Sequence, residues 1–343
     1  MARRILWGTL ALAPAVLIAH YAFHLGETAS FVFAALALIP LAWLIGDATD
    51  HAAEHTGPAV GGLLNASFGN APELIIALLA VADGLPAVVR GTITGSVVSN
   101  ILLVLGIAML VGGDGRLDAR SLRWQLAGVA GGVALLLVPS IPSWGSSPDR
   151  GSLFDVTIPI AIVLLVAYVW VTVANLRVHA EEEREPAAEG AWSLPLSLGV
   201  LGIATVATAL VSEVLVHSLN AFGNAVGLSQ FFVAVVIVAL VGNAAEHGGA
   251  VVIAHRGNMH LATEIAVTSS MQVALFVAPV VALVSTLLSH HLTLAFLPVE
   301  CATMAASAVL AWFVTRNGRS SRRYGALLVG AYGAAVAAYA LFP

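Results

Sequence analysis

The stretch GNAAEHGG, residues 242–249, places Asn243, Glu246 and His247 inside one of the most apolar segments of the chain. A second stretch, GNAPELI at 69–75, repeats the same order of asparagine and glutamate. On a helix, residues three positions apart share one face. Two copies of a polar motif in apolar surroundings indicate a functional site.

The composition of the chain predicts an integral membrane protein. Of 343 residues, 59% are hydrophobic and only 10% are charged, which is too little charge to cover a soluble protein of this length. The single cysteine, Cys301, excludes disulfides within the chain and argues against a thiolate metal cluster. The net charge is −5, all fourteen basic residues are arginine, and we expect no nucleic-acid partner. The oligomeric state is left open.

Apolar runs between polar breaks predict an all-α polytopic fold of eleven transmembrane helices, because about 20 apolar residues cross a bilayer. The first run follows Arg3 and Arg4 as a signal peptide would. It is long, however, and no clear cleavage site follows, so we interpret it as a retained helix. The expected spans are 5–23, 29–47, 58–82, 86–111, 122–139, 154–175, 193–218, 228–255, 260–287, 293–314 and 323–341.

The distribution of arginine predicts the orientation of these spans. With a cytoplasmic N-terminus, twelve of the fourteen arginines lie in inside segments, and only Arg90 and Arg150 lie outside. We therefore expect a multi-pass protein of a bacterial-type inner (plasma) membrane, with its N-terminus in the cytoplasm.

The hydrophilic segment VHAEEEREPAAEG, at 178–190, separates six spans from five and is expected in the cytoplasm. Its five glutamates fit either a solvated hinge or an acidic surface that concentrates cations, and the sequence leaves both open. The expected organisation is an extra N-terminal transmembrane helix at 1–28, a five-helix repeat at 29–177, an acidic linker at 178–191 and a second five-helix repeat at 192–343.

The two halves carry an internal repeat with an offset of 173 residues, the separation of Glu73 and Glu246. At this offset GNAPE aligns with GNAAE, and Ser96 aligns with Ser269. An odd number of spans in each half gives the two copies opposite orientations. Such inverted repeats are typical of secondary transporters, whose sites lie near the bilayer midplane on interrupted helices.

The sequence also predicts the interruptions. Gly69 and Pro72 bracket Asn70, and Pro72 lacks the backbone donor that a continuous helix would use. The freed carbonyl then needs a polar partner or an ion. Gly242 loosens the second helix without a proline.

The paired glutamates predict a site for a divalent cation. Glu73 and Glu246, related by the pseudo-two-fold axis, would offer two negative charges in an oxygen-only ligand set suited to Ca²⁺. Because two close carboxylates repel each other, protons would replace the departing cation, and this competition gives antiport. Packing of helices is the alternative role for the other polar residues. These further predicted ligands are Asn70, Asn243, Ser96, Ser99, Ser269 and Gln272, and Asn100 shares the helix face of Ser96 and Ser99.

Other polar residues of the spans are assigned supporting roles. Asp50 and Glu54 fit a cytoplasmic entrance, and Glu213, deeper in its span, fits proton coupling. His247 is expected to modulate the proton affinity of its neighbour Glu246, with a packed neutral histidine as the alternative. Less specific positions are Asp47, His217 and Glu300.

The sequence HAAEH at 51–55 introduces a second class of function. It matches the H-x-x-E-H pattern of inverted zinc peptidases and places His51 and His55 on one helical face. A membrane zinc hydrolase, however, explains neither the repeat nor the second glutamate motif. A passive cation channel is a third alternative, but one chain reveals no acidic ring at an oligomer axis.

The motifs resemble those of the calcium/proton exchangers of the cation/calcium antiporter superfamily. This resemblance implies eleven helices, no cofactor, and exchange of cytoplasmic Ca²⁺, or another divalent cation, for protons by alternating access. It also implies that Glu73 and Glu246 bind both cation and proton, and a sodium/calcium exchanger is the nearest alternative. The matching stretches are GDATDHAAEHTGPAVGGLLNASFGNAPELIIALLA (46–80), GSVVSNILLVLG (95–106), VGNAAEHGGAVVIA (241–254) and SSMQVALFVAPV (269–280).

Four positions depart from that family's usual residues. The family usually has glutamate at the position of Asp50 and glycine at that of Thr268. It more often has aspartate and a small residue at the positions of His260 and Glu264. These departures bear on ion preference and on pH dependence.

Overall fold

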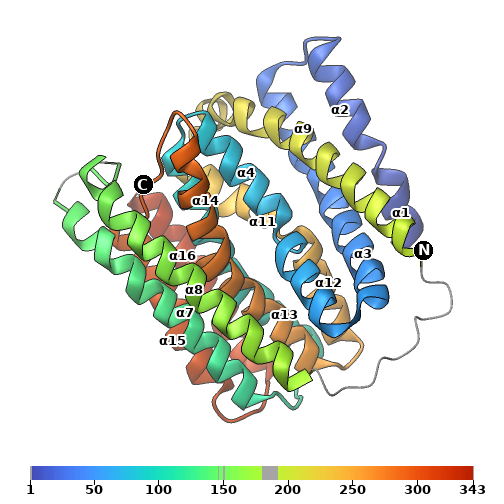
Figure 1. The fold of residues 1–343 in the computed structure, drawn as a ribbon, viewed down its shortest axis with the longest axis vertical. Helices are drawn as coiled ribbons and strands as arrows, with labels where there is room; N and C mark the ends of the chain where they lie inside the picture. The colour runs from blue at the N-terminus through green and yellow to red at the C-terminus, as the bar shows by residue number, and fades with distance from the viewer. Residues whose placement is uncertain (1, 146, 150, 180–191, 343) are drawn as a thin grey trace. The chain divides into compact units, whose positions relative to one another are not determined.

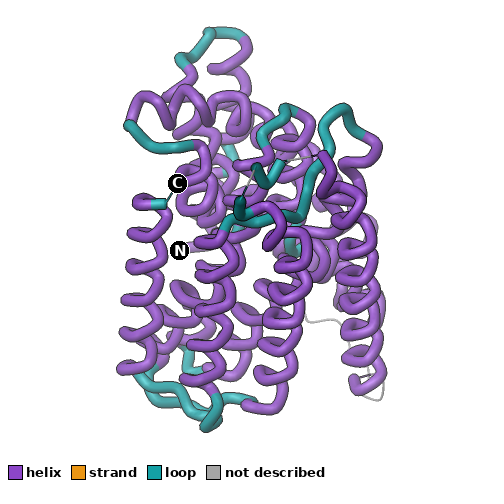
Figure 2. Tube along the Cα trace, turned by 90° about the vertical axis from the view of Figure 1, so that its left-hand side faces the viewer, coloured by secondary structure: helices purple, strands orange, loops and turns teal. Residues whose placement is uncertain are grey.

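The computed structural model describes residues 2–145, 147–149, 151–179 and 192–342. Within these ranges the chain is helical and contains no strand (Figure 2). Eight described helices are long and apolar enough to cross a membrane, or nine if the bent pair Gln230–Gly242 and Ala244–His255 forms one span. The prediction of an all-helical multi-pass membrane protein is confirmed.

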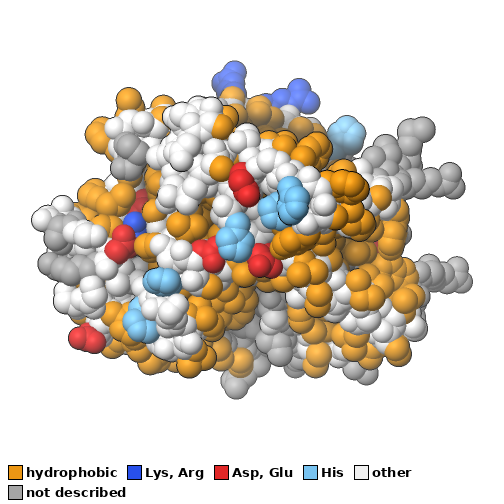
Figure 3. All heavy atoms as spheres, turned by 90° about the horizontal axis from the view of Figure 1, so that it is seen from above, with side chains coloured by type: hydrophobic (Ala, Val, Ile, Leu, Met, Phe, Trp, Pro, Cys, Tyr) orange, Lys and Arg blue, Asp and Glu red, His pale blue; other side chains and the backbone are white. Residues whose placement is uncertain are grey.

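The surface of these helices is apolar. Hydrophobic side chains cover much of the surface drawn in Figure 3, and charged side chains are few there. Large apolar residues on membrane-length helices are exposed, among them Trp170, Ile203 and Val309. Helices that are apolar all round and open to their surroundings are typical of membrane spans.

The first and third predicted spans correspond to helical segments that are shorter than a membrane crossing, so the count of eleven spans stays a prediction. The first predicted span is divided into α1 (Ala2–Thr9) and α2 (Leu12–Tyr21), and the third ends in α4 (Ala71–Ala82). These segments fall below the length of a regular membrane crossing because irregular backbone interrupts them.

The helix α3 (Glu27–Phe68) combines the second predicted span with the start of the third. The helix comprises 42 residues, yet it is not straight. A Cβ on Gly61 would lie 2.9 Å from the Cβ of Ala53, eight residues earlier. A straight helix separates such residues by about 12 Å along its axis. The chain therefore reverses its direction between Ala53 and Gly61. The second and third predicted spans are thus separated near residues 48–57, as expected, but the connection between them is helical.

The chain forms two compact units, and each unit combines segments from both halves of the sequence. The first unit consists of residues 1–79, 166–228 and 241–245, and the second of 80–165, 229–240 and 246–343. This spatial division differs from the division into sequence repeats, whose boundaries stay a prediction.

In the first unit, α3 packs against α9 (Leu194–Val226), and α2 packs against both (Figure 1). Phe31 of α3 stacks on Phe222 of α9 with ring centroids 4.3 Å apart. A cluster of buried apolar residues joins the two long helices to the start of α4. Its members are Leu44, Ile45, Ala48, Ala71, Leu201 and Ala204.

In the second unit, α5 (Pro86–Val98) is the central helix, since every residue from Val88 to Val98 is buried. It packs against α13, α15 and the π-helical segment η4. Elsewhere in this unit α7 packs against α13 and α15, and α6 packs against α16. The bounds are α6 (Leu105–Gly112), α7 (Ala119–Ser140), α10 (Gln230–Phe232), η4 (Val233–Val238), α13 (Met259–Gln272), α14 (Ala278–Val284), α15 (Pro298–Thr315) and α16 (Arg322–Leu341). The helix α8 (Phe154–His179) begins in the second unit and ends in the first.

Two glycines allow the close contact between α5 and η4. A Cβ on Gly95 would lie 2.1 Å from the carbonyl oxygen of Val235, and one on Gly91 would lie 2.9 Å from the Cβ of Ala234. Both distances are shorter than an ordinary van der Waals contact. Glycine at these two positions, one helical turn apart, therefore sets how closely the two helices approach.

The helix bounds reproduce the sequence repeat. The bounds of α4 (Ala71–Ala82) and α12 (Ala244–His255) are displaced by the 173 residues that separate Glu73 from Glu246. The π-helical segment η1 (Ser99–Val104) corresponds in the same way to η5 (Val273–Val277), within one residue at its start. Because π-helical turns are rare, their recurrence at equivalent positions supports the repeat independently of the GNAPE and GNAAE strings.

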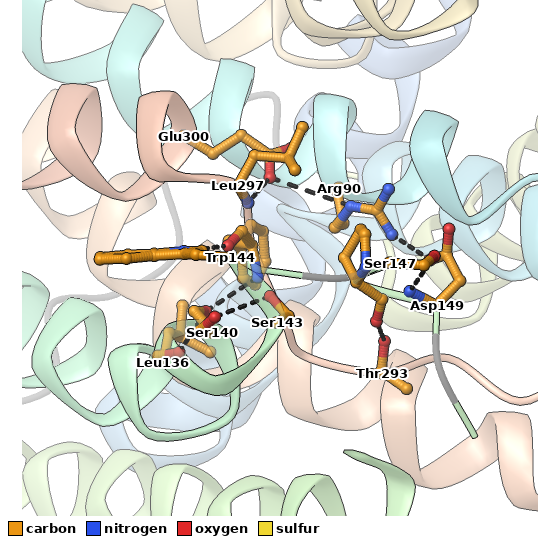
Figure 4. A network of polar contacts seen from close by, with 12 residues as sticks. Arg90, Leu136, Ser140, Ser143, Trp144, Ser147, Asp149, Thr293, Leu297 and Glu300 are labelled. Carbon is orange, nitrogen blue, oxygen red and sulfur yellow. Dashed lines mark hydrogen bonds and ion pairs between the residues drawn. The ribbon is translucent and has the colours of Figure 1, made fainter. Parts of the chain in front are cut away.

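A polar network joins α5 to the α7–α8 loop and to the start of α15 (Figure 4). The buried guanidinium of Arg90 pairs with Asp149, and its Nε lies 3.9 Å from Oε2 of Glu300. Glu300 is fully buried and also accepts a hydrogen bond from the backbone N–H of Leu297. Two buried charges are thus paired with each other, as burial requires.

Candidate functional site

Both acidic motifs lie where a broken helix restarts. Asn70 directly precedes α4 and Asn243 directly precedes α12, while Glu73 and Glu246 are the third residues of these helices. Asparagine is favoured at the N-cap position, and the partial positive charge of a helix N-terminus stabilises a carboxylate. The asparagine and the glutamate of each motif are three positions apart, which was predicted to place them on one face of a helix. In the structure the asparagine instead precedes the helix and the glutamate is its third residue. The predicted breaks are confirmed, and the second bends the helix by 58°.

The glutamate of the first motif contacts the break in the second motif. Asn70 and Glu73 are buried, and a Cβ on Gly242 would lie 3.2 Å from Oε1 of Glu73. The Glu73 carboxylate therefore lies against the backbone of the residue that precedes Asn243. Pro72 occupies the first turn of α4, where a missing N–H costs no helical hydrogen bond.

In the second unit, a chain of hydrogen bonds joins His247 to Glu246 through two other residues. The Nε2 of His247 lies 2.8 Å from Oδ1 of Asn100, and Nδ2 of Asn100 donates to Oγ of Ser269 over 2.9 Å. Ser269 in turn forms a side-chain hydrogen bond with Glu246. An amide oxygen only accepts, so His247 is the donor to Asn100, and the hydroxyl of Ser269 is left to donate to the carboxylate.

This hydrogen-bond chain gives Asn100 a role that the predicted ligand list lacks. Asn100 lies in η1 and is buried, and it connects the second acidic helix to α13. The serine that follows Ser269 makes a second contact of the same kind, since the hydroxyl of Ser270 donates to the carbonyl of Val97 over 3.2 Å. The sequence signal was the S-x-x-S-N spacing at 96–100, which placed Asn100 on the polar face of its helix.

Three further predicted ligands lie beside the π-helical segments. Ser96 and Ser99 are fully buried in and after α5, and Gln272 is the last residue of α13. Ser99 begins η1, and η5 begins directly after Gln272. π-helical turns occur frequently at functional sites, because the wider turn re-aims side chains and carbonyls. Glu246 retains a buried oxygen, Oε2, with no hydrogen-bond partner in the described part of the chain.

Comparison with known proteins identifies the family of the chain. The profile of the family described as Sodium/calcium exchanger protein matches residues 27–177 and 196–340. The chain belongs to this family.

Two known Ca²⁺/H⁺ antiporters are similar to nearly the whole chain. A Ca²⁺/H⁺ antiporter of Aphanothece halophytica is 34% identical, over 96% of this chain and 94% of its own length. The Ca²⁺/H⁺ antiporter ChaA of Bacillus subtilis is 35% identical, over 90% of this chain and 91% of its own. The resemblance to calcium/proton exchangers is thus confirmed.

Solved structures show the same fold. The structure of native YfkE has a TM-score of 0.85 and 31% identity, covering 98% of this chain and 100% of its own. A crystal structure of the H⁺/Ca²⁺ exchanger CAX has a TM-score of 0.76 but only 14% identity, covering 99% of this chain and 92% of its own. The second likeness is evidence of fold alone.

Three residues predicted for supporting roles in this exchanger-family chain, Asp50, Glu54 and Glu213, lie elsewhere, in its first unit. Asp50 is exposed on α3 among Asp47, His51 and Glu54, so three carboxylates and a histidine share this surface. Glu213 lies half-buried on α9, within electrostatic range of Tyr21. Residues 180–191, most of the predicted acidic linker, lie outside the described residues.

The HAAEH sequence has structural contacts of its own. Nε2 of His55 lies 2.5 Å from the carbonyl oxygen of Trp192, and the ring of His51 lies over the Trp192 indole with centroids 4.7 Å apart. Because a backbone carbonyl only accepts, Nε2 of His55 is the donor in this contact. These contacts favour a role in packing α3 against the segment that precedes α9.

Proposed function

We propose that this chain is a secondary transporter that exchanges cytoplasmic Ca²⁺ for protons by alternating access. The observation that carries the proposal is the pair of acidic residues at equivalent helix starts. Glu73 lies buried against Gly242, and Glu246 accepts from Ser269. The names of the near-full-length relatives, Ca²⁺/H⁺ antiporters at 34–35% identity, support this choice of substrates.

The chemistry of these residues suits a hard divalent cation. Carboxylate, amide and hydroxyl oxygens are the ligands that Ca²⁺ prefers. In the proposal Glu73 and Glu246 bind Ca²⁺ or protons, and no resident cofactor is needed. The neighbouring oxygens come from Asn70, Asn243, Ser96, Ser99, Ser269 and Gln272.

Competition for the carboxylates couples the two substrates. A buried carboxylate without a cation gains by taking up a proton, and binding of the cation releases it. The His247–Asn100–Ser269 chain would transmit the state of the imidazole to Glu246. The equivalent residue in the first half is Leu74, so this device is present only at the second glutamate.

The architecture proposed for this cycle has eleven spans, with inverted five-helix repeats at 29–177 and 192–343 and an extra helix at 1–28. The 173-residue displacement of helix bounds supports the repeat. The arginine distribution supports a cytoplasmic N-terminus and linker, and the inner membrane is the proposed location. With this orientation an inward proton gradient would drive Ca²⁺ out of the cell.

Ca²⁺ uptake into inside-out vesicles tests the proposal. We expect accumulation driven by an interior-acid pH gradient in the absence of sodium. Glu73→Gln and Glu246→Gln should each abolish it. Glu27→Gln is the matched control, because Glu27 also lies in the first turn of a helix but is exposed. Strict dependence on sodium would establish the sodium/calcium exchange alternative, and retained uptake in both glutamine variants would refute the assigned ligands.

A further inference from the structure

A second group of metal-ligating side chains lies apart from the proposed transport residues. Asp118, at the start of α7, and His260 and Glu264, on the first turns of α13, each offer a ligand atom within 4.8 Å of the other two. The three residues belong to the second unit, in which α7 packs against α13. They combine one imidazole and two carboxylates from segments about 140 residues apart in the sequence.

Local hydrogen bonds orient the carboxylate of Asp118. Its Oδ1 accepts the backbone N–H groups of Arg120 and Ser121 at 2.8 and 3.0 Å, as an N-cap residue does. The bond from Ser121, followed by that from Arg120, holds the pKa of Asp118 below its usual value. Oδ1 is thus held by the start of α7, and Oδ2 remains for a ligand.

The other two ligands are positioned by α13. His260 and Glu264 are one helical turn apart, with Nδ1 and Oε2 separated by 3.8 Å. Asn258 caps this helix by accepting the backbone N–H of Leu261 over 3.1 Å. Arg120 is close enough to interact electrostatically with Asp118, but within the described part of the chain neither carboxylate of the group forms an ion pair with an arginine.

We propose that Asp118, His260 and Glu264 form a surface site for a transition-metal dication of the Zn²⁺ type, distinct from the oxygen-only site for Ca²⁺. One imidazole nitrogen with two carboxylate oxygens suits Zn²⁺, whereas Ca²⁺ and Mg²⁺ prefer oxygen ligands alone. Three protein ligands leave a fourth tetrahedral position for water. The group is exposed enough for a metal to reach it from solution.

Metal binding here would connect the starts of α7 and α13. The same helix α13 carries Ser269, five residues after Glu264, or about 7.5 Å further along the axis. A bound metal would therefore restrain the helix that supplies the hydrogen bond to Glu246. The proposal concerns binding, and it stands or falls independently of which ions are transported.

Calorimetric titration of the purified full chain with Zn²⁺ tests the site. The Glu73→Gln/Glu246→Gln background removes the proposed transport ligands, and one Zn²⁺ should still bind. In that background His260→Ala and Asp118→Asn should each weaken binding at least tenfold. Asparagine is as good an N-cap as aspartate, so this variant keeps the fold of α7. His255→Ala, another exposed histidine nearby, should leave the affinity unchanged.

Two results would overturn the proposal. One is loss of all Zn²⁺ binding in the Glu73→Gln/Glu246→Gln background, which would assign the metal to the transport residues. The other is equal affinity in the parent, His260→Ala and Asp118→Asn proteins. Cobalt substitution supplies an independent measurement, because the visible spectrum of bound Co²⁺ should change on loss of His260 and not on loss of His255.

Discussion

Replacement of Gly95 by alanine should separate α5 from η4. The added Cβ would lie 2.1 Å from the carbonyl oxygen of Val235 and 2.6 Å from the Cβ of Ala239, where contacts of about 3.5–4 Å are normal. The helices must therefore move apart by more than about 1 Å. Overpacking of this kind costs about 1–3 kcal/mol and occasionally more, and we expect Gly95→Ala to lie at the upper end.

A graded set of variants makes this prediction quantitative. Gly91→Ala brings its nearest contact to 2.9 Å and should cost about 1 kcal/mol, since a small shift relieves it. Gly131→Ala, in the middle of α7 with no atom within 4 Å, should gain up to about 1 kcal/mol from helix propensity. The order of stability should be Gly131→Ala, parent, Gly91→Ala, Gly95→Ala.

Thermal unfolding of the purified protein in detergent measures this order, and vesicle uptake measures function. Gly95→Ala should also lose most transport, because Ser96 follows directly on the displaced helix. If Gly95→Ala melts together with the parent and transports normally, the close approach of α5 to η4 is incorrect. Gly131→Ala shows that the effect comes from the contact and not from adding a methyl group to a helix.

Three further predictions concern single contacts. Ser269→Ala removes the hydrogen bond to Glu246 and should weaken Ca²⁺ binding about 3- to 10-fold, because that is the contribution of one such bond. The half-saturating Ca²⁺ concentration for uptake measures this change. Arg90→Met leaves Glu300 as a buried carboxylate without its cation and should destabilise the folded protein by about 3–5 kcal/mol. Adding Glu300→Gln should restore part of that stability in thermal unfolding. If the double variant is no more stable than Arg90→Met, the pairing is contradicted. Asp118→Ala should destabilise by about 1 kcal/mol at neutral pH. Because the folded-state pKa of Asp118 is lowered, its contribution is present above the unfolded value near 3.8 and is lost as pH falls through the folded-state value, so melting curves of variant and parent should converge in acid.

The repeat and its helix breaks follow from local chemistry. Asn70 and Asn243 directly precede helices, Pro72 fits the first turn of a helix, and Gly242 weakens the helix before it. Each of these preferences acts within one turn of the chain, so the sequence predicts them. The continuation of helix α3 through its reversal was not predicted, because the apolar runs 29–47 and 58–82 were assigned to two separate spans.

Contacts between segments far apart in the chain could not be predicted from the sequence. Asn100 meets Ser269 across 169 residues and His247 across 147, and Glu73 reaches the backbone at Gly242. Such pairs depend on the rotation of each helix and on how closely glycines let helices approach. No local preference encodes either quantity.

The sequence by itself determined that the chain crosses a membrane many times, that it contains two copies of one motif, and that its glutamates are chemically equivalent. Only the tertiary structure decided which partners those glutamates meet. Composition and helix-start chemistry are properties of short segments, whereas a buried hydrogen bond needs two helices set to within an ångström of each other. The relative position of two helices results from packing of the whole unit. It gives the two glutamates different partners, since Glu246 is linked to a histidine and Glu73 lies against a glycine.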